Sequence, residues 1–357
     1  MTNLPQDDLV CQGEEALLFE YLSEISEKDA EWDVRKAQLD IVSKMFLRAG
    51  FENYSVRTRL CSGCLRFAKV ICGRSGKTRI KLVEVKYCDC RSCTICQWRR
   101  TLFWMHRYFE ILPNLCGSYP TARFLFVTLT VPNCDIYDLR DTIKKMNSGW
   151  HLFMKRKELS HFHGWIRTTE VTKGKDGLLR AHPHFHVLIL AKPSYFTKYY
   201  LKHDRWLALW QESMRDFSIS QVNIKAPKQL RKENGHATEE IRDDGPNELP
   251  NQLLNDGQYV GAYVLKYAVK PSDLIGLGAD DSESVEWFGE YTRQVHNLRF
   301  VATGGVFKKL FSKTVSQNEM TTLEDEEIEK EPDIILNDGV LFNWNLKEKR
   351  YKRLKGK

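Results

Sequence analysis

The sequence predicts an α+β protein in which an antiparallel sheet carries flanking helices. A first strand is expected over residues 123–131, where β-branched and aromatic residues run up to Pro132. Two further strands, 164–172 and 182–190, are separated by a turn-rich segment that is typical of an antiparallel hairpin. Apolar residues at helical spacing over 138–157 and 205–214 predict helices that flank this sheet.

Composition narrows the class of protein. The chain has 357 residues, 42% of them hydrophobic, which allows two or three domains with a sizeable core. Its net charge of +7 favours an anionic partner. No apolar run reaches about eighteen residues and no secretory leader is evident, so we expect a cytoplasmic protein with no membrane partner.

Changes in composition divide the chain into four regions. Residues 1–58 are expected to form a helical accessory region, and 59–110 a small cysteine-rich N-terminal module. The main domain is expected over 111–315, with a polar surface insertion at 228–250. An acidic linker followed by a basic tail is expected over 316–357, with a final strand over 338–346 before the basic terminus.

The cysteine-rich module predicts a structural zinc ion. Two C-x-x-C pairs, Cys61 with Cys64 and Cys93 with Cys96, offer the four thiolates that tetrahedral zinc prefers. Cys88 and Cys90 precede the second pair closely and are alternative ligands. Buried thiols without a metal are the other interpretation.

Basic and aromatic residues follow the cysteines on an expected helix. Arg99 and Arg100 lie in the segment Gln97-Trp-Arg-Arg, which is compatible with contact to DNA. The same pattern also suits a packing face on which long basic side chains cover apolar surface. The sequence favours neither interpretation.

A histidine-rich strand predicts a catalytic metal site. In His182-Pro-His184-Phe-His186, alternation places His184 and His186 on one face of the strand. Glu170 is the carboxylate of the preceding strand, and the hairpin can bring it beside both imidazoles. Two imidazoles and one carboxylate would leave positions on a divalent ion open for water and a phosphate oxygen. We expect His182 to lie outside this ligand set.

A tyrosine-bearing helix is expected from Asn255 or Asp256 to a stop at Pro271. One arc of about 100° of this helix carries phenols and ammonium groups; its members are Tyr259, Tyr263, Lys266, Tyr267 and Lys270. Phenols flanked by positive charge are suited to attack on phosphodiesters. The alternative is that the tyrosines pack at intervals of four residues while the lysines reach solvent.

Three of these blocks together resemble a known family. The strand Phe126-Val-Thr-Leu-Thr-Val-Pro-Asn133, the segment His182-Pro-His-Phe-His-Val-Leu188 and the motif Lys266-Tyr-x-x-Lys270 occur in the order found in HUH endonucleases. They are most similar to the blocks of plasmid rolling-circle replication initiators, in which a cysteine cluster ending in Trp-Arg-Arg also precedes the first block. The resemblance covers residues 60–310.

The resemblance implies a ferredoxin-like palm of antiparallel strands that nicks DNA. His184, His186 and Glu170 would hold Mg²⁺ or Mn²⁺, and imidazole ligands favour Mn²⁺. Tyr267 would be the nucleophile, with Lys270 or Lys266 beside it, and it would form a 5′-phosphotyrosine adduct that leaves a free 3′-OH. Tyr263 stands where the plasmid family often has a glutamate, and resembles the second nucleophile of single-stranded-DNA phage initiators.

The expected partners are single-stranded or extruded origin DNA, a host DNA polymerase and a host helicase, since no Walker-type motif is evident. Two alternatives stay open. One is a transposase or relaxase of a mobile element in the same superfamily, and the other is a non-catalytic zinc-dependent protein that only binds nucleic acid.

Overall fold

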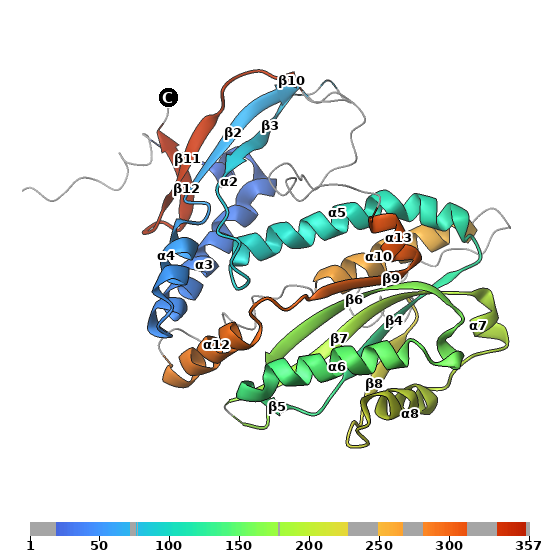
Figure 1. Cartoon of the computed structure of the whole chain (residues 1–357). Helices are drawn as coiled ribbons and strands as arrows, with labels where there is room; N and C mark the ends of the chain where they lie inside the picture. The colour runs from blue at the N-terminus through green and yellow to red at the C-terminus, as the bar shows by residue number, and fades with distance from the viewer. Residues whose placement is uncertain are drawn as a thin grey trace, which may run out of the picture.

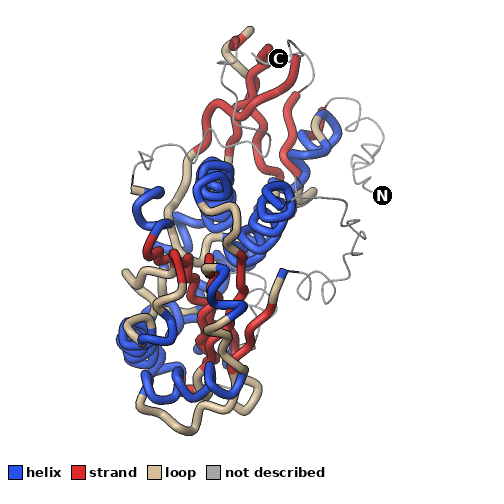
Figure 2. Tube along the Cα trace, turned by 90° about the vertical axis from the view of Figure 1, so that its right-hand side faces the viewer, coloured by secondary structure: helices blue, strands red, loops and turns tan. Residues whose placement is uncertain are grey.

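The computed structural model describes residues 19–71, 76, 78–177, 179–227, 249–266, 281–312 and 334–354. Two antiparallel sheets lie at opposite ends of the molecule, and helices fill the space between them (Figures 1 and 2). Helix α5 (Thr94–Ser118) runs between the two sheets for much of the width of the molecule (Figure 1). The expected α+β class is therefore observed in the described part of the chain.

Strands β4 to β9 form the sheet that carries the histidines. Its order is β8-β4-β7-β6-β9, and β5 pairs with β7. The strands are β4 (Arg123–Thr130), β5 (Cys134–Asp135), β6 (Phe162–Lys173), β7 (Arg180–Ala191), β8 (Val222–Lys225) and β9 (Val301–Gly305). β6 and β7 pair antiparallel as the predicted hairpin, and β4 pairs with the other edge of β7.

Alternation along β7 explains how helices cover this sheet. Phe185, Val187 and Ile189 point to a buried cluster shared with α6 (Leu139–Phe153) and α8 (His203–Met214). Leu188 and Leu190 point the other way, into a cluster shared with α5, α10 (Leu249–Lys266) and α13 (Val306–Phe311). His184 and His186 have the same parity as these leucines, so they lie on the face that α5 and α10 cover.

A second sheet packs against the N-terminal helices. Its order is β1-β12-β11-β2-β10, with β3 paired to β2. The strands are β1 (Phe19–Tyr21), β2 (Cys64–Ile71), β3 (Thr78–Val85), β10 (Ile334–Ile335), β11 (Val340–Asn345) and β12 (Arg350–Leu354). The remaining elements are α2 (Leu22–Ile25), α3 (Glu31–Arg48), α4 (Glu52–Leu60), α7 (Pro193–Thr197), α12 (Ser282–Gln294) and the short 3-10 turns η1 (Glu27–Ala30), η2 (Ile136–Asp138) and η3 (Lys157–Leu159).

Two predictions of organisation need correction. Residues 316–357 were expected to be a linker and tail with one strand at 338–346; that strand is present as β11, but the described part also forms β10 and β12, and Tyr351 of β12 is fully buried. The tyrosine helix begins at Leu249 instead of Asn255, because a proline such as Pro250 is tolerated in the first helical turn. Most of the expected insertion at 228–250, the acidic stretch and the expected stop at Pro271 lie outside the described residues.

Close contact between α5 and α10 depends on glycine. The hydroxyl of Tyr108 in α5 donates a hydrogen bond of 2.9 Å to the carbonyl of Gly257 in α10. One turn later, a Cβ atom on Gly261 would lie 2.0 Å from the Tyr108 ring. Because Tyr108 is fully buried, its ring has no free space into which to move. Gly261 therefore sets how closely the tyrosine helix approaches α5.

Replacing Gly261 with alanine should destabilise the protein by about 1–3 kcal/mol, because the added methyl group overpacks this helix contact. Thermal and denaturant unfolding would measure the loss. The matched control is Gly117→Ala in α5, where nothing lies within 4 Å of the new methyl group. That control should be neutral or stabilising by roughly 0.5–1 kcal/mol. Equal effects of the two substitutions would contradict the proposed packing role.

Candidate functional site

The register of the β6–β7 hairpin brings the three predicted metal ligands together. Glu170 is directly opposite His184, and Thr168 is opposite His186. One carboxylate oxygen, Glu170 Oε2, lies 2.6 Å from His184 Nε2 and 2.7 Å from His186 Nε2. All three side chains are buried. A one-residue shift of register would send Glu170 to the opposite face and remove the site.

The donor atoms of this triad fit a divalent cation. Neighbouring ligands of an octahedral ion lie about 3.0 Å apart when each bond is about 2.1 Å. The observed distances are a few tenths of an ångström shorter. The three side chains therefore need to move apart only slightly to hold an ion. Burial raises the pKa of Glu170, but hydrogen bonds and charge from His184 and His186 outweigh burial and hold that pKa at about 2. The carboxylate is therefore ionised and available as a ligand.

Neighbouring polar side chains orient the imidazoles. Thr128 of β4 lies opposite His186, and its hydroxyl is 3.2 Å from His186 Nδ1. His184 Nδ1 is 3.2 Å from the carbonyl of His182. His182 itself bonds Asn133 at 2.7 Å and stays outside the triad, as predicted. The second nitrogen of each ligand ring therefore has a partner that leaves Nε2 directed at the metal position.

Helix α10 lies over the histidine face of the sheet. Thr168, opposite His186, donates a hydrogen bond of 3.4 Å to the carbonyl of Val264. The ring of Phe126 stacks on His186 at a centroid distance of 5.6 Å and meets the ring of Tyr263 edge-on at 5.0 Å. Tyr263 is therefore one aromatic ring away from His186, and it also stacks on Tyr259 at 6.5 Å.

The predicted nucleophile lies outside the described residues. The structure describes α10 as far as Lys266, whose side chain is not placed, and Tyr267 and Lys270 follow beyond it. Their roles stay predictions. The described end of the helix lies at the level of Thr168, whose hydroxyl bonds the carbonyl of Val264.

Four sulfur atoms gather at the start of α5. They belong to Cys61, Cys88, Cys93 and Cys96, and all four side chains are buried. Cys96 Sγ lies 3.7 Å from the sulfurs of Cys61 and Cys88, and Cys93 Sγ lies 3.6 Å from that of Cys61. A zinc tetrahedron with bonds of about 2.3 Å has edges of about 3.8 Å. A disulfide would require about 2.0 Å, so the spacing fits a metal.

Cys88, the alternative ligand, takes the place predicted for Cys64. Cys64 begins strand β2, is partly exposed and lies outside the group of four. Ser62 adopts a left-handed conformation with φ 51°, which turns the chain between Cys61 and the strand. Cys90, the other alternative, is buried and its thiol bonds the carbonyl of Cys88.

The electrostatics of the cysteine cluster also favour a cation. Burial raises the pKa of Cys93, and hydrogen bonds with Cys61 and Cys88 raise the pKa of Cys96. Hydrogen bonds from Cys88 and Cys93 lower the pKa of Cys61. The four thiols therefore share negative charge, and full ionisation needs a bound positive ion.

Lys36 is a buried residue beside the cysteine cluster that sequence reasoning missed. It is 1% exposed, and its ammonium group donates hydrogen bonds of 2.6 Å to the carbonyl of Cys61 and 2.8 Å to that of Arg59. A zinc ion with four thiolates carries two net negative charges, which a buried ammonium group can offset. In the sequence, Lys36 looks like an ordinary solvent-facing lysine of an amphipathic helix, so no signal marks it.

The structure separates the two arginines for which DNA contact and packing were both left open. Arg99 is 5% exposed, and its guanidinium lies 5.6 Å from the ring centre of Trp32 and 5.4 Å from that of Trp98. This placement favours the packing alternative for Arg99. Arg100 is half-buried, lines a pocket and forms an ion pair of 3.4 Å with Asp89.

Cysteine substitution distinguishes the two candidate ligand sets. Cys88→Ser should lose bound zinc, because it removes one of the four convergent sulfurs. Cys64→Ser should keep one zinc ion per chain, since Cys64 lies outside the group. Metal content of the purified variants, measured by atomic absorption, would check both expectations. Zinc loss from Cys64→Ser with retention in Cys88→Ser would reverse the assignment.

Removing the hydroxyl beside His186 should weaken metal binding at the triad. Thr128→Val deletes the partner of His186 Nδ1 and is expected to lower Mn²⁺ affinity about 10-fold. Titration calorimetry or Mn²⁺ electron paramagnetic resonance would measure the change. Thr130→Val is the control, because the Thr130 hydroxyl bonds the carbonyl of Gln221 instead of an imidazole. The assignment fails if both variants bind the ion as tightly as the parent chain.

Comparison with known proteins agrees with the sequence resemblance. The model of the family described as "Replication protein" matches residues 79–352. "Protein rep" of Bacillus amyloliquefaciens is 26% identical over 91% of this chain and 94% of its own length. "Protein rep" of Streptococcus pneumoniae is 26% identical over 79% of each chain. A third "Protein rep", from Staphylococcus aureus, is 33% identical over 42% of this chain and 66% of its own.

No solved structure matches the chain significantly. No helix in the described ranges is long and apolar enough to cross a bilayer. The family match spans β3 to β12 and so includes the glutamate–histidine triad, three of the four clustered cysteines and the described length of α10. The chain therefore belongs to the replication protein family, as its resemblance to plasmid replication initiators predicts.

Proposed function

We propose that this protein initiates plasmid rolling-circle replication by nicking and rejoining single-stranded origin DNA through a 5′-phosphotyrosine intermediate. The observation that carries the proposal is the convergence of Glu170, His184 and His186 on one buried point beneath α10, in a member of a replication protein family. A triad of this composition leaves ligand positions for a phosphate oxygen.

A divalent cation at the triad would act as a Lewis acid on the scissile phosphate. The residues of the chain supply the rest of the site. Glu170 contacts both imidazoles through one carboxylate oxygen, and the Thr128 hydroxyl bonds His186 at Nδ1, the ring nitrogen that faces away from Glu170. Mn²⁺ suits the two nitrogen donors better than Mg²⁺ does, and either ion matches the carboxylate.

In the proposed reaction, the phenol oxygen of Tyr267 forms a bond to phosphorus as the bond from phosphorus to the 3′ oxygen breaks. The phenol gives up its proton, and the departing 3′ oxygen takes one up. Lys266 and Lys270 would favour the phenolate and neutralise the phosphate. Because one phosphodiester replaces another, the 3′-OH can reverse the step and rejoin the strand.

The proposed role of Tyr263 is that of a second nucleophile one helical turn earlier. Its ring now meets Phe126 and Tyr259. To reach the phosphate, it would need to leave the edge-on contact with Phe126. The contacts with Phe126 and Tyr259 favour the packing role for Tyr263. Substitution of Tyr263 distinguishes this packing role from that of a second nucleophile.

Substitution of each tyrosine by phenylalanine tests the nucleophile. Tyr267→Phe should abolish the covalent adduct formed with a labelled single-stranded origin oligonucleotide and Mn²⁺, as judged by gel mobility after denaturation. Tyr263→Phe should still form the first adduct but lose strand transfer to a second oligonucleotide. Glu170→Gln should suppress both reactions. A fully active Tyr267→Phe variant would falsify the nucleophile assignment.

The adduct assay also separates the alternatives. A non-catalytic zinc-dependent DNA-binding protein would bind the oligonucleotide without forming an adduct. A transposase or relaxase would share the nicking step, but the match to replication proteins favours replication. Unwinding and synthesis by a host helicase and DNA polymerase complete the proposal.

A further inference from the structure

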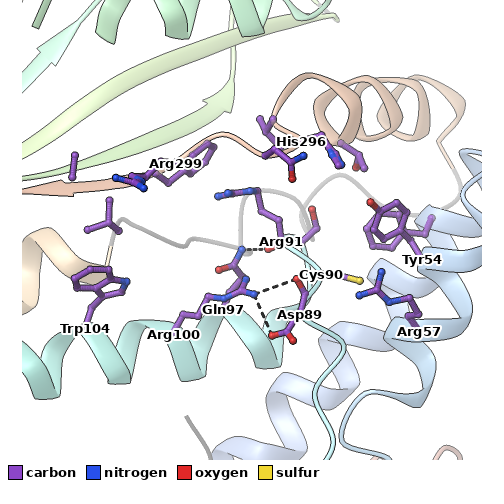
Figure 3. Close-up of a pocket in the computed structure, with 18 of the residues that line it drawn as sticks. Tyr54, Arg57, Asp89, Cys90, Arg91, Gln97, Arg100, Trp104, His296 and Arg299 are labelled. Atoms are coloured by element: carbon purple, nitrogen blue, oxygen red, sulfur yellow. Dashed lines mark hydrogen bonds and ion pairs between the residues drawn. The ribbon is translucent and has the colours of Figure 1, made fainter. Parts of the chain in front are cut away.

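A pocket of about 850 Å³ lies between the helices next to the cysteine cluster and strand β9 at the edge of the histidine-bearing sheet (Figure 3). One wall comes from α4 and the loop 89–92, and another from the first half of α5. The opposite wall is the segment 292–303, which leads from α12 into β9. Figure 3 shows Trp104 on α5 facing Arg299 across the pocket, whereas Arg100 of the same helix turns toward Asp89.

The pocket has the composition of a site for a single nucleic-acid strand. Its described lining residues include five lysines and arginines and one carboxylate, that of Asp89. The cations are Arg57, Arg91, Arg100, Arg299 and Lys308. Tyr54, Trp104 and Phe300 add aromatic surface. Phosphate groups need the positive charge, and unpaired bases stack on aromatic rings.

The cations of the pocket differ in how firmly the protein holds them. Arg91 donates a hydrogen bond to the carbonyl of Leu298, and its guanidinium lies 4.2 Å from the ring centre of Phe300. Arg57 donates to the carbonyl of Cys88, and Arg100 pairs with Asp89. Arg299 and Lys308 are exposed and have no ion pair or side-chain hydrogen bond within the described ranges. These two are the cations available to a ligand.

The pocket borders the metal triad. Phe300 in its wall accepts a hydrogen bond of 2.8 Å from the backbone N–H of Thr169, the residue before Glu170. Val301 and Thr303 of the same wall pair with Thr168 and Ile166 of β6, so they share the histidine face. Burial raises the pKa of the Tyr291 phenol to about 12, the charge of Arg91 lowers this pKa and the charge of Glu170 raises it.

We infer that this pocket holds the stretch of single-stranded DNA next to the scissile phosphate, with Arg299 and Lys308 binding its backbone and Trp104 offering a stacking surface. The inference rests on the proposed function for the identity of the strand. Double-stranded DNA is disfavoured because stacking on Trp104 requires an unpaired base.

The cysteine cluster shapes one wall of this pocket. Asp89, Cys90, Arg91 and Ser92 form the loop between two of the clustered cysteines, Cys88 and Cys93, and all four residues line the pocket. Asp89 adopts φ 56°, a left-handed conformation that the loop has to maintain. A zinc ion on the four sulfurs would thus hold Arg91 against Leu298 and keep the two walls at a fixed separation.

The test is a double variant, Arg299→Ala with Lys308→Ala. Its binding to a labelled single-stranded oligothymidylate would be measured by fluorescence anisotropy over a range of salt concentrations, without divalent ions. We expect about tenfold weaker binding. The logarithmic salt dependence should fall by about 1.4, since each phosphate contact on a single strand contributes about 0.7.

A matched control removes the same charge from the opposite side of the sheet. Lys155 follows α6 and Lys202 precedes α8, and both side chains are exposed. Lys155→Ala with Lys202→Ala should leave affinity and salt dependence at the level of the parent chain. If the control weakens binding as much as Arg299→Ala with Lys308→Ala, the effect reflects net charge and the pocket assignment is overturned.

The outcomes also separate this inference from the proposed function. Covalent adduct formation by the parent chain, together with unchanged binding by the pocket variant, would overturn the pocket alone. Failure of the parent chain to form an adduct, together with weaker binding by the pocket variant, would overturn the nicking reaction and retain the pocket. A duplex probe bound as tightly as the single strand would contradict the stacking argument.

Discussion

The arrangement of the site depends on one carboxylate oxygen shared by two imidazoles. Glu170 Oε2 lies within 2.7 Å of both His184 and His186, and all three groups come from two strands of one hairpin. The hairpin keeps this spacing because twelve-residue strands β6 and β7 are paired along their length and lie between β4 and β9. Burial then makes the interaction strong, since water is excluded around the charge.

Helix α5 connects this centre with the cysteine cluster. Its first turn contains Cys96, and its middle packs through Tyr108 on the glycines of α10. The same helix carries Arg100 and Trp104 on the pocket wall. A displacement of the cysteine cluster would therefore shift both the pocket wall and the support of the tyrosine helix.

Much of the site could be predicted from the sequence because it depends on residues that are close together along the chain. Alternation along one strand placed His184 and His186 together, and a short turn placed Glu170 opposite them. Cys88 and Cys64 could not be separated, since the choice depends on how the chain turns at Ser62 and on the packing of β2. Lys36, the burial of Arg99 and the pocket beside β9 depend on contacts between segments far apart in sequence. Such contacts produce no periodic pattern in the sequence from which they could be predicted.

Strand β12 pairs with β1 on one side and β11 on the other, and Arg353 binds Glu20 across 333 positions of sequence. The sheet beside the cysteine cluster is therefore complete only after residues near 350 have been synthesised. During translation, β4, β6, β7 and β9 can assemble while this closing strand is still inside the ribosome. A nascent chain would thus hold a complete histidine centre before its cysteine-side sheet is finished.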